Sequence, residues 1–148
     1  MPRREIKIYS DGEPIFIGWV DDWNLSYLPN GDSITDATAF DGFSILAGQK
    51  LPLSTPVEQL AGARVDAILN LPDVNWDPTL RSIEPGVLNM GTQEIALGAN
   101  VLNYLQQITR TEDGLLYMSK DGKVTFKERL RPFNIPEVVD FNQGSGIP

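Results

Sequence analysis

Cysteine and histidine are both missing from this sequence of 148 residues. Without cysteine the chain can form no disulfide bond, no thiolate metal site and no cysteine nucleophile. Without histidine it lacks the commonest general base and metal ligand, and a Ser-His-Asp triad is excluded within the chain. Only carboxylate, lysine or tyrosine chemistry remains for catalysis. We therefore expect no enzymatic activity and no cofactor.

Lysine and arginine are scarce as well. Twelve of them stand against 20 aspartate and glutamate residues, which gives a net charge of −8 and a pI near 4.4. Because nucleic-acid binding relies on clustered basic side chains, we expect no nucleic-acid partner. No apolar run approaches the roughly 18 residues that cross a membrane, and the start of the chain shows no signal-peptide pattern. The 41% share of hydrophobic residues is typical of a globular protein.

The clearest pattern lies between Gly98 and Arg129, where a predicted helix leads directly into a predicted hairpin. Apolar residues recur at three- and four-residue spacing and form one stripe of that helix: Val101, Leu102, Leu105 and Ile108. Asp113-Gly114 is expected to end the helix, because glycine adopts the left-handed conformation of a C-terminal cap without strain. The stripe predicts that this helix covers another layer of the fold.

The hairpin is predicted from Asp121-Gly122, a dipeptide that suits the positive φ angles of a two-residue turn. In that register one face consists of residues that the helix would cover, namely Leu115, Tyr117, Val124 and Phe126. Leu116 and Met118 would then point to the opposite face, which is too apolar to stay fully hydrated. The sequence thus predicts Leu116 and Met118, together with Phe16 on an earlier hairpin, as subunit-interface residues.

Residues 1–50 are predicted to form an antiparallel β meander of four strands. Asp11-Gly12 marks a two-residue turn between the first two. That turn would give the first hairpin one apolar face, made of Ile6, Ile8, Ile15, Ile17 and Trp19. Asp21-Asp22 interrupts the pattern before a third strand, in which apolar residues alternate with polar ones: Trp23, Leu25 and Tyr27. Residues 33–40 are expected to be the fourth strand.

Two further helices are predicted from their start signals. Asp41 would cap a short helix over residues 42–47. Thr55, Pro56 and Glu58 together make a capping box for a longer helix. The apolar stripe of that longer helix comprises Val57, Leu60, Ala61, Val65, Ile68 and Leu69.

Residues 70–98 lack a regular period, and so long a connection inside a small domain is unusual. Several apolar side chains indicate that packing holds this segment in place: Trp76, Leu80, Ile83, Val87 and Leu88. Short strands are expected at 94–97 and 137–141. We expect an α+β fold with mostly antiparallel strands, two main amphipathic helices, and one helix packed on the C-terminal hairpin. Its predicted parts are a meander at 1–50, a helix–linker–helix–hairpin region at 51–131 and a tail at 132–148.

Three groups of residues invite a chemical interpretation. The pairs Asp21-Asp22 and Glu112-Asp113 suggest the two carboxylates of a glycosidase, but neighbours in a strand point to opposite faces, so neither pair is a natural dyad, and turn or cap roles explain them better. Oxygen ligands for a hard cation are offered by Asn30, Asp32, Asp36 and Asp41, without the spacing of an EF-hand. Three tryptophans and four tyrosines suggest a sugar-stacking platform. However, Trp19 and Trp23 fall on apolar faces of predicted strands, where aromatic residues more often belong to a core.

Three runs of the sequence, in the same order, resemble segments of the minor tail and tail-hub proteins of tailed bacteriophages. IKIYSDGEPIFIGWVDDWNLSY (6–27) is similar to the family's entry strands, and RVDAILNLPDVNWDPTLRSIEPG (64–86) to its helix and W-x-P linker. GANVLNYLQQITRTEDGLLYMSKDGKVTFKER (98–129) resembles a helix that ends at an acidic residue plus glycine and leads into a DG hairpin. The chain departs from the family in length, since members are usually much longer.

This resemblance implies a structural protein of a phage or prophage tail tip that is assembled in the host cytoplasm and becomes part of the virion. It further implies a homotrimer that contacts other tail or baseplate proteins, and no metal, cofactor or catalytic residue. The residues alone leave a second function open, a carbohydrate-binding module for host attachment.

Overall fold

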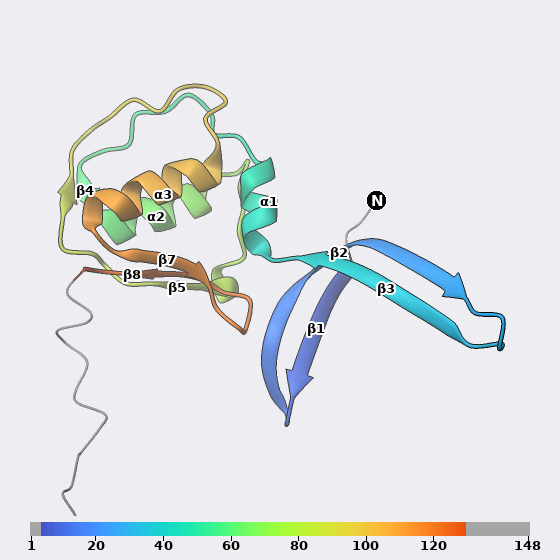
Figure 1. Ribbon diagram of the computed structural model, residues 1–148. Coiled ribbons are helices and arrows are strands. Elements are labelled where there is room, and N and C mark those ends of the chain that lie inside the picture. Colours follow the sequence, from blue (N-terminus) through green and yellow to red (C-terminus); the bar gives the residue numbers. More distant parts are fainter. Residues whose placement is uncertain (1–3, 130–148) are drawn as a thin grey trace, which may run out of the picture.

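The computed structural model describes residues 4–129 and has the predicted α+β fold. A packed body of helices and short strands carries a β-sheet that projects from one side (Figure 1). The body contains, in chain order, α1 (Gly42–Gly48), β4 (Gln59–Leu60), α2 (Ala61–Leu69), the 3-10 helix η1 (Pro78–Leu80), β5 (Arg81–Ile83), β6 (Asn89–Met90), α3 (Val101–Glu112), β7 (Leu115–Met118) and β8 (Val124–Lys127).

The projecting sheet consists of β1 (Arg4–Ser10), β2 (Glu13–Tyr27) and β3 (Ser33–Phe40), with β2 in the centre. β1 pairs with the first half of β2, and β3 pairs with the second half. The sheet is therefore three strands wide at Trp19 and Val20 and two strands wide on either side. We call residues 4–18 the first limb and residues 21–38 the second limb. The two limbs diverge from their junction (Figure 1).

The predicted four-strand meander is wrong, because β2 continues through Asp21-Asp22 where the sequence suggested a break between two strands. Val20 pairs with Ala39 and Asp22 pairs with Thr38, which leaves Asp21 as an extra residue on β2. Such a β-bulge bends a strand and increases its twist without ending it. The acidic pair therefore marks the place where β2 passes from one limb to the other.

The predicted turn at Asp11-Gly12 is confirmed by positive φ angles of 51° and 84°. The register that we predicted beyond it is wrong. Ile8 pairs with Phe16, and Ile15 is left as an extra residue in a second bulge.

This shift of one residue redistributes the apolar side chains of the first hairpin over both faces, because neighbouring residues in a strand point in opposite directions. Ile6 and Ile8 share a face with Phe16, whereas Ile17 and Trp19 lie on the other face. The single apolar face that the sequence suggested is therefore absent from the first limb.

In the body, α2 and α3 lie on one side of the sheet β5-β8-β7 (Figure 1). β8 is its central strand, antiparallel to β7 and parallel to β5. α3 packs on the β7–β8 hairpin, as predicted. The fully buried apolar side chains between these layers include Leu46, Leu51, Val65, Leu69, Val101, Leu105, Ile108, Val124 and Phe126. Burial of each large apolar side chain stabilises the fold by about 1.5–3 kcal/mol.

The turn of the β7–β8 hairpin has one residue more than predicted. The Ser119 amide donates to the Lys123 carbonyl, and the Lys123 amide donates to the Ser119 hydroxyl, so the turn consists of Lys120, Asp121 and Gly122. Gly122 has φ 76°, as expected for the left-handed residue of a three-residue turn. The longer turn moves every following residue to the other face, and this changes which side of the hairpin packs on the helices.

The start of α1 is confirmed, since the Asp41 carboxylate accepts a hydrogen bond from the Phe43 amide at 3.1 Å. The projecting sheet ends at Phe40, and Leu46 of α1 is already buried in the body. The passage from sheet to body therefore comes earlier in the chain than the division predicted after residue 50.

The predicted capping box at Thr55 is wrong, because α2 begins at Ala61. The preceding residues pair with the segment around Asn89 instead, through β4 and β6. The Glu58 carboxylate accepts a hydrogen bond from the Asn89 side chain rather than closing a helix cap. Tertiary contacts have overridden the local signal.

Residues 70–98 are held by packing at some of the predicted positions: Trp76 is buried, and Leu80 and Ile83 pack against the core. Val87 is exposed. β5 was not predicted, and the expected strand at 94–97 is reduced to one bridge between Ser54 and Ile95. The predicted strand at 137–141 and the tail at 132–148 lie outside the described residues.

Candidate assembly surface on the projecting limbs

The second limb presents a row of large apolar side chains to solvent. Trp23, Leu25 and Tyr27 alternate along β2 and therefore lie on one face of the ribbon. Their exposed fractions are 54%, 49% and 79%. They pair across to small residues of β3, namely Ala37, Thr35 and Ser33, which leave the large side chains uncovered. We call Trp23, Leu25 and Tyr27 the limb face.

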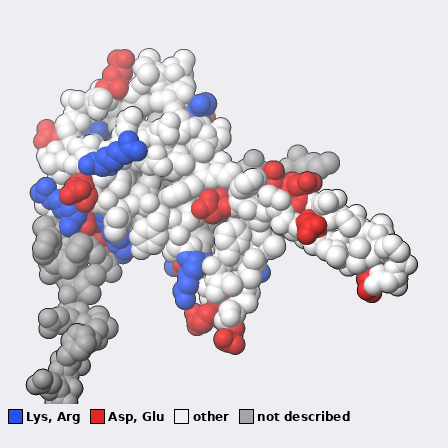
Figure 2. Space-filling model, in the orientation of Figure 1, with Lys and Arg blue, Asp and Glu red and all other residues white. Residues whose placement is uncertain are grey.

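The charge of the second limb is of one sign. Residues 21–38 contain four aspartates and no lysine or arginine. Figure 2 shows the second limb as a largely uncharged finger with a few acidic groups. An isolated two-stranded ribbon is marginally stable in water, and apolar residues on its surface favour association. The limb is therefore a candidate docking surface.

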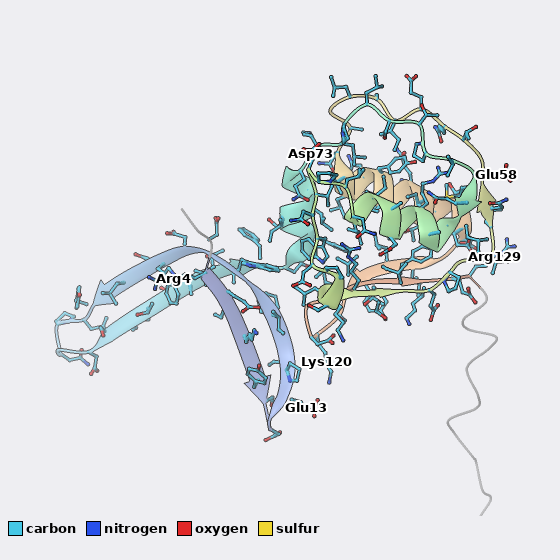
Figure 3. All side chains as sticks on the ribbon, turned by 180° about the vertical axis from the view of Figure 1, so that it is seen from behind. Arg4, Glu13, Glu58, Asp73, Lys120 and Arg129 are labelled. Atoms are coloured by element: carbon cyan, nitrogen blue, oxygen red, sulfur yellow. The ribbon has the colours of Figure 1, made fainter. Side chains whose placement is uncertain are left out.

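The first limb is held against the body, in contrast to the second. Trp19, at the junction of the two limbs, meets Trp76 of the body edge to face, with ring centroids 6.1 Å apart. Lys120, in the β7–β8 turn, lies 3.5 Å from the Glu13 carboxylate at the limb tip, and Figure 3 shows the two side chains beside each other. A Cβ added to Gly122 would lie 3.0 Å from Ile17. The contacts of Glu13 and Ile17 place the first limb beside the β7–β8 turn.

Asp121 strengthens the turn on which the first limb rests. Hydrogen bonds from Lys123 and then from Ser119 lower the pKa of the Asp121 carboxyl below its ordinary value. Lys123 Nζ lies 2.9 Å from one carboxylate oxygen, and Ser119 donates to the other at 2.5 Å. The ionised carboxylate thus ties both arms of the turn together.

The structure changes the position of two predicted interface residues. Leu116 and Met118 pair with Phe126 and Val124 and pack against the core, because of the extra turn residue. Leu115 and Tyr117, which we predicted to face the helix, are exposed on the opposite side. The outward position that made Leu116 and Met118 interface candidates is therefore wrong.

Phe16, the third predicted interface residue, is half-buried on the first limb and lies on the face of Ile8. Its ring covers Gly18, where an added Cβ would lie 2.6 Å from Phe16 Cζ. Its role in an interface remains a prediction. The residues that sequence reasoning missed are those of the limb face, whose alternating pattern suggested a covered strand although nothing in residues 4–129 covers it.

The carboxylate pairs have separate structural roles. Glu112 is fully buried, and its two oxygens accept hydrogen bonds from the Val87 and Leu88 amides at 2.9 and 2.8 Å. Asp113 forms the left-handed C-cap of α3. Asp22 accepts a hydrogen bond from the amide of Trp23, beside the bulge. Glu112 and Asp113 thus have separate structural roles, as do Asp21 in the bulge and Asp22 beside it.

The candidate cation ligands are spread over the second limb and its root. The Asn30 amide donates to Asp32 at 2.6 Å within the tip turn, Asp36 lies midway along β3, and Asp41 caps α1. Within residues 4–129 no three acidic side chains gather as a metal site would require. Among the described helices, none has the length and apolar character to cross a membrane.

No family model matches the sequence, and no curated protein does. Eight chains of solved structures match the fold. One of them is the 43 kDa tail protein of prophage MuSo2 from Shewanella oneidensis, with a TM-score of 0.63 and 18% sequence identity. The match covers 82% of this chain and 36% of that protein, so this chain spans about a third of its length. At this identity the likeness concerns the fold.

Proposed function

We propose that this chain is a structural component of a phage or prophage tail, located at the tail tip as a minor tail or tail-hub protein. It acts by protein–protein assembly and catalyses no reaction. The likeness of its fold to a prophage tail protein supports this proposal. So do the sequence runs that resemble tail-hub proteins, which include β2 and the α3–β7–β8 region.

The observation that carries the proposal is the uncovered limb face. Trp23, Leu25 and Tyr27 project into solvent from a ribbon only two strands wide. Covering these side chains would bury apolar area at about 25 cal/mol per Å². A neighbouring chain supplies such a cover at the least cost, because the limb already extends away from its own body (Figure 1).

Besides the limb face, the unpaired edges of β2 offer a second way for the limbs to contact another chain. Within residues 4–129, each limb leaves one edge of β2 without a neighbouring strand, and exposed edges add strands from other chains. A limb that pairs with the next copy makes a head-to-tail contact, and such contacts close into a ring when the rotations between copies add up to a full turn. We propose a homotrimer that contacts other tail or baseplate proteins, with no nucleic-acid partner.

Light scattering at several protein concentrations tests this assembly. We expect a mass that rises above the 16.4 kDa of one chain. The double variant Trp23→Lys, Tyr27→Lys should remain a monomer, because a charge buried in an interface costs several kcal/mol. The matched control is Asn24→Lys, Ser26→Lys, which places the same charges on the opposite face of the same strand and should still associate.

A wild-type chain that stays monomeric at every concentration, and that binds no neighbouring tail protein on reconstitution, contradicts the proposal. Equal association of the two double variants would show that the limb face is not the contact.

A carbohydrate-binding module is the alternative, favoured by the exposed rings of Trp23 and Tyr27 on one face. Aromatic rings stack on the apolar faces of sugars. A glycan array that gives signal with the wild type and none with Trp23→Ala would favour this alternative. Assembly would then not explain the limb face.

A further inference from the structure

The two faces of the second limb differ in polarity. One is the limb face, which continues onto small residues of β3. The opposite face is mostly polar and includes a single large apolar residue, Ile34; its other side chains are Asp22, Asn24, Ser26, Asp36 and Thr38. The carboxylates of Asp22 and Asp36 therefore point away from the limb face. A second chain can cover the limb face without burying either of them.

Both strands of the second limb have a free edge within residues 4–129. β1 pairs with β2 only as far as Val20, so the edge of β2 over residues 21–27 has no neighbour on that side. β3 pairs with β2 alone, so its outer edge is free as well. The two free edges lie on opposite sides of a ribbon that extends away from the body (Figure 1). A strand from another chain can therefore add on either side.

Side-chain size alternates between the two strands of the ribbon. Each cross-strand pair on the limb face joins a large residue of β2 to a small one of β3: Trp23 with Ala37, Leu25 with Thr35, and Tyr27 with Ser33. If the β3 edge of one copy lies beside the β2 edge of the next, strands with large and small side chains alternate around the assembly. Small closed barrels fill their interior by such an alternation, with each layer of side chains supplied by alternate strands.

The area of the limb face distinguishes three copies from two. An aromatic side chain buries about 150–250 Å². Trp23 and Tyr27 are more than half exposed and Leu25 is nearly so, which leaves roughly 350 Å² to cover on each limb. Two limbs would bury roughly 700 Å², less than the roughly 1,000 Å² that a specific interface needs, whereas three limbs together reach that size.

We propose that the second limbs of three copies join edge to edge into a closed six-stranded antiparallel sheet, with the limb faces inside. Each β3 edge pairs with the β2 edge of the next copy, and repetition of this contact closes the ring. Trp23, Leu25 and Tyr27 form three layers of the interior, and the polar face remains in water. This inference rests on the homotrimer proposed above and specifies which surfaces of the copies meet.

Disulfide cross-linking in the full chain tests which edges meet, and the absence of cysteine from the sequence makes each link unambiguous. One copy carries Asp36→Cys on β3. A co-expressed copy with a different tag carries Asp22→Cys, Asn24→Cys or Ser26→Cys, all on the same face of β2. These three positions sample registers two residues apart, which keep the faces of the strands unchanged. After mild oxidation we expect a link at one of them, because a disulfide forms only where two Cα atoms lie within about 7 Å.

Two controls separate this contact from random collision. In the proposed sheet a β3 edge meets a β2 edge, so none of the single-cysteine variants should link to a second copy of itself. Glu5→Cys, on β1 of the first limb, should not link to Asp36→Cys. Reduction of the sample should release every link that does form.

A matched pair of phenylalanine variants tests the filled interior. Ala37→Phe places a ring at a small position of the limb face, and Thr38→Phe places the same ring on the polar face. Both positions are exposed in the single chain, so both variants should fold. Because a packed interior does not tolerate extra volume, Ala37→Phe should weaken association at least about tenfold, whereas Thr38→Phe should change it by less than about twofold. Light scattering over a dilution series measures both.

Several results would overturn the inference and leave the proposed assembly standing. They are association without a link from Asp36→Cys to any of the three β2 positions, equal linking in the controls, and equal effects of the two Phe variants. An assembly of two chains would also exclude the closed sheet of three limbs. A chain that stays monomeric contradicts the proposed function itself, and the inference then falls with it.

Discussion

The β7–β8 hairpin and the second limb are two hairpins of one chain in opposite environments. In the β7–β8 hairpin, Val124 and Phe126 alternate along β8 and are buried in the core. In the second limb, Trp23 and Tyr27 lie on one face of β2 in the same way but stay exposed. The difference lies in the cover, because α3 packs on β7 whereas the second limb extends away from the body (Figure 1).

This contrast separates two meanings of an alternating apolar pattern. It specifies a strand with one face to be buried, but it does not say which chain supplies the burial. In the body, helix α3 of the same chain covers the hairpin. At the second limb we propose that another chain provides it. The two regions should therefore respond very differently to equivalent mutations.

Removing an aromatic ring from each region should give the largest contrast. Phe126→Ala is expected to cost about 3–5 kcal/mol of unfolding free energy, because it leaves a cavity in the core. Tyr27→Ala should change the unfolding free energy of the monomer by less than about 0.5 kcal/mol. Urea denaturation at a concentration where the chain is monomeric measures both. Similar losses in the two variants would show that the limb is part of the cooperative core.

Neutralising one acid in each region should sharpen the comparison. Glu112→Gln weakens the hydrogen bonds from the Val87 and Leu88 amides and is expected to cost about 1.5–3 kcal/mol. Faster hydrogen exchange at these two amides would locate the effect. Asp36→Asn, at an exposed position of β3, is the matched control and should leave the stability within about 0.5 kcal/mol of the wild type.

Alanine substitutions at two turn glycines compare the effect of backbone strain in the β7–β8 turn with its effect at the tip of the second limb. Gly122 and Gly31 both have positive φ angles, 76° and 90°. Gly122→Ala adds contact with Ile17 to the backbone strain and is expected to cost about 1–2 kcal/mol. Gly31→Ala meets nothing within 4 Å, so its strain should be released by local opening of the second limb. Thermal unfolding of the two variants should therefore differ, and equal shifts would argue against a separately opening limb.

The smallest effect is expected from Asp121, in the turn that supports the first limb. Because the folded-state pKa of this carboxyl is lowered, its contribution is fully present above the unfolded value near 3.8 and is lost as the pH falls through the lower folded-state value. The side chain is partly exposed, so Asp121→Asn should cost only about 0.5 kcal/mol at neutral pH. Urea titrations at neutral pH and near pH 3 measure the difference, which should be smaller at the acidic pH. A constant difference would assign the loss to another cause.

Local signals in the sequence predicted the parts of the fold that local chemistry decides. Asp11-Gly12 predicted its turn, Asp41 predicted its helix cap, and the apolar stripe of α3 predicted the helix that covers the hairpin. In each case the residues that give the signal also make the interaction. The α+β class follows from these elements.

The wrong registers have a common physical cause. A bulge at Ile15 and an extra residue in the turn at Lys120 each shift a strand by one position. One position reverses the two faces of a strand, which is why Leu116 and Met118 were expected outside and pack inside. The hydrophobic pattern alone tolerates either register, because Leu115 and Tyr117 are apolar as well.

Other differences come from contacts between distant segments. The capping box predicted at Thr55 does not form, because the residues before α2 pair with β6 through β4. The parallel strand β5 is only three residues long and gains its identity from β8, more than 40 residues later. The limb face could be recognised as a strand but not as uncovered, since exposure depends on where the rest of the chain packs.

The continuity of β2 has a mechanical consequence. A pull on the tip of the second limb travels down both of its strands in the same direction, so the cross-strand hydrogen bonds carry little shear. Along β3 the tension reaches α1 and its buried Leu46. Along β2 the tension passes the Asp21 bulge and reaches Trp19, whose ring contacts the ring of Trp76 in the body. The second limb is thus a tether with two anchors in the body, and a load applied at its end is shared between them.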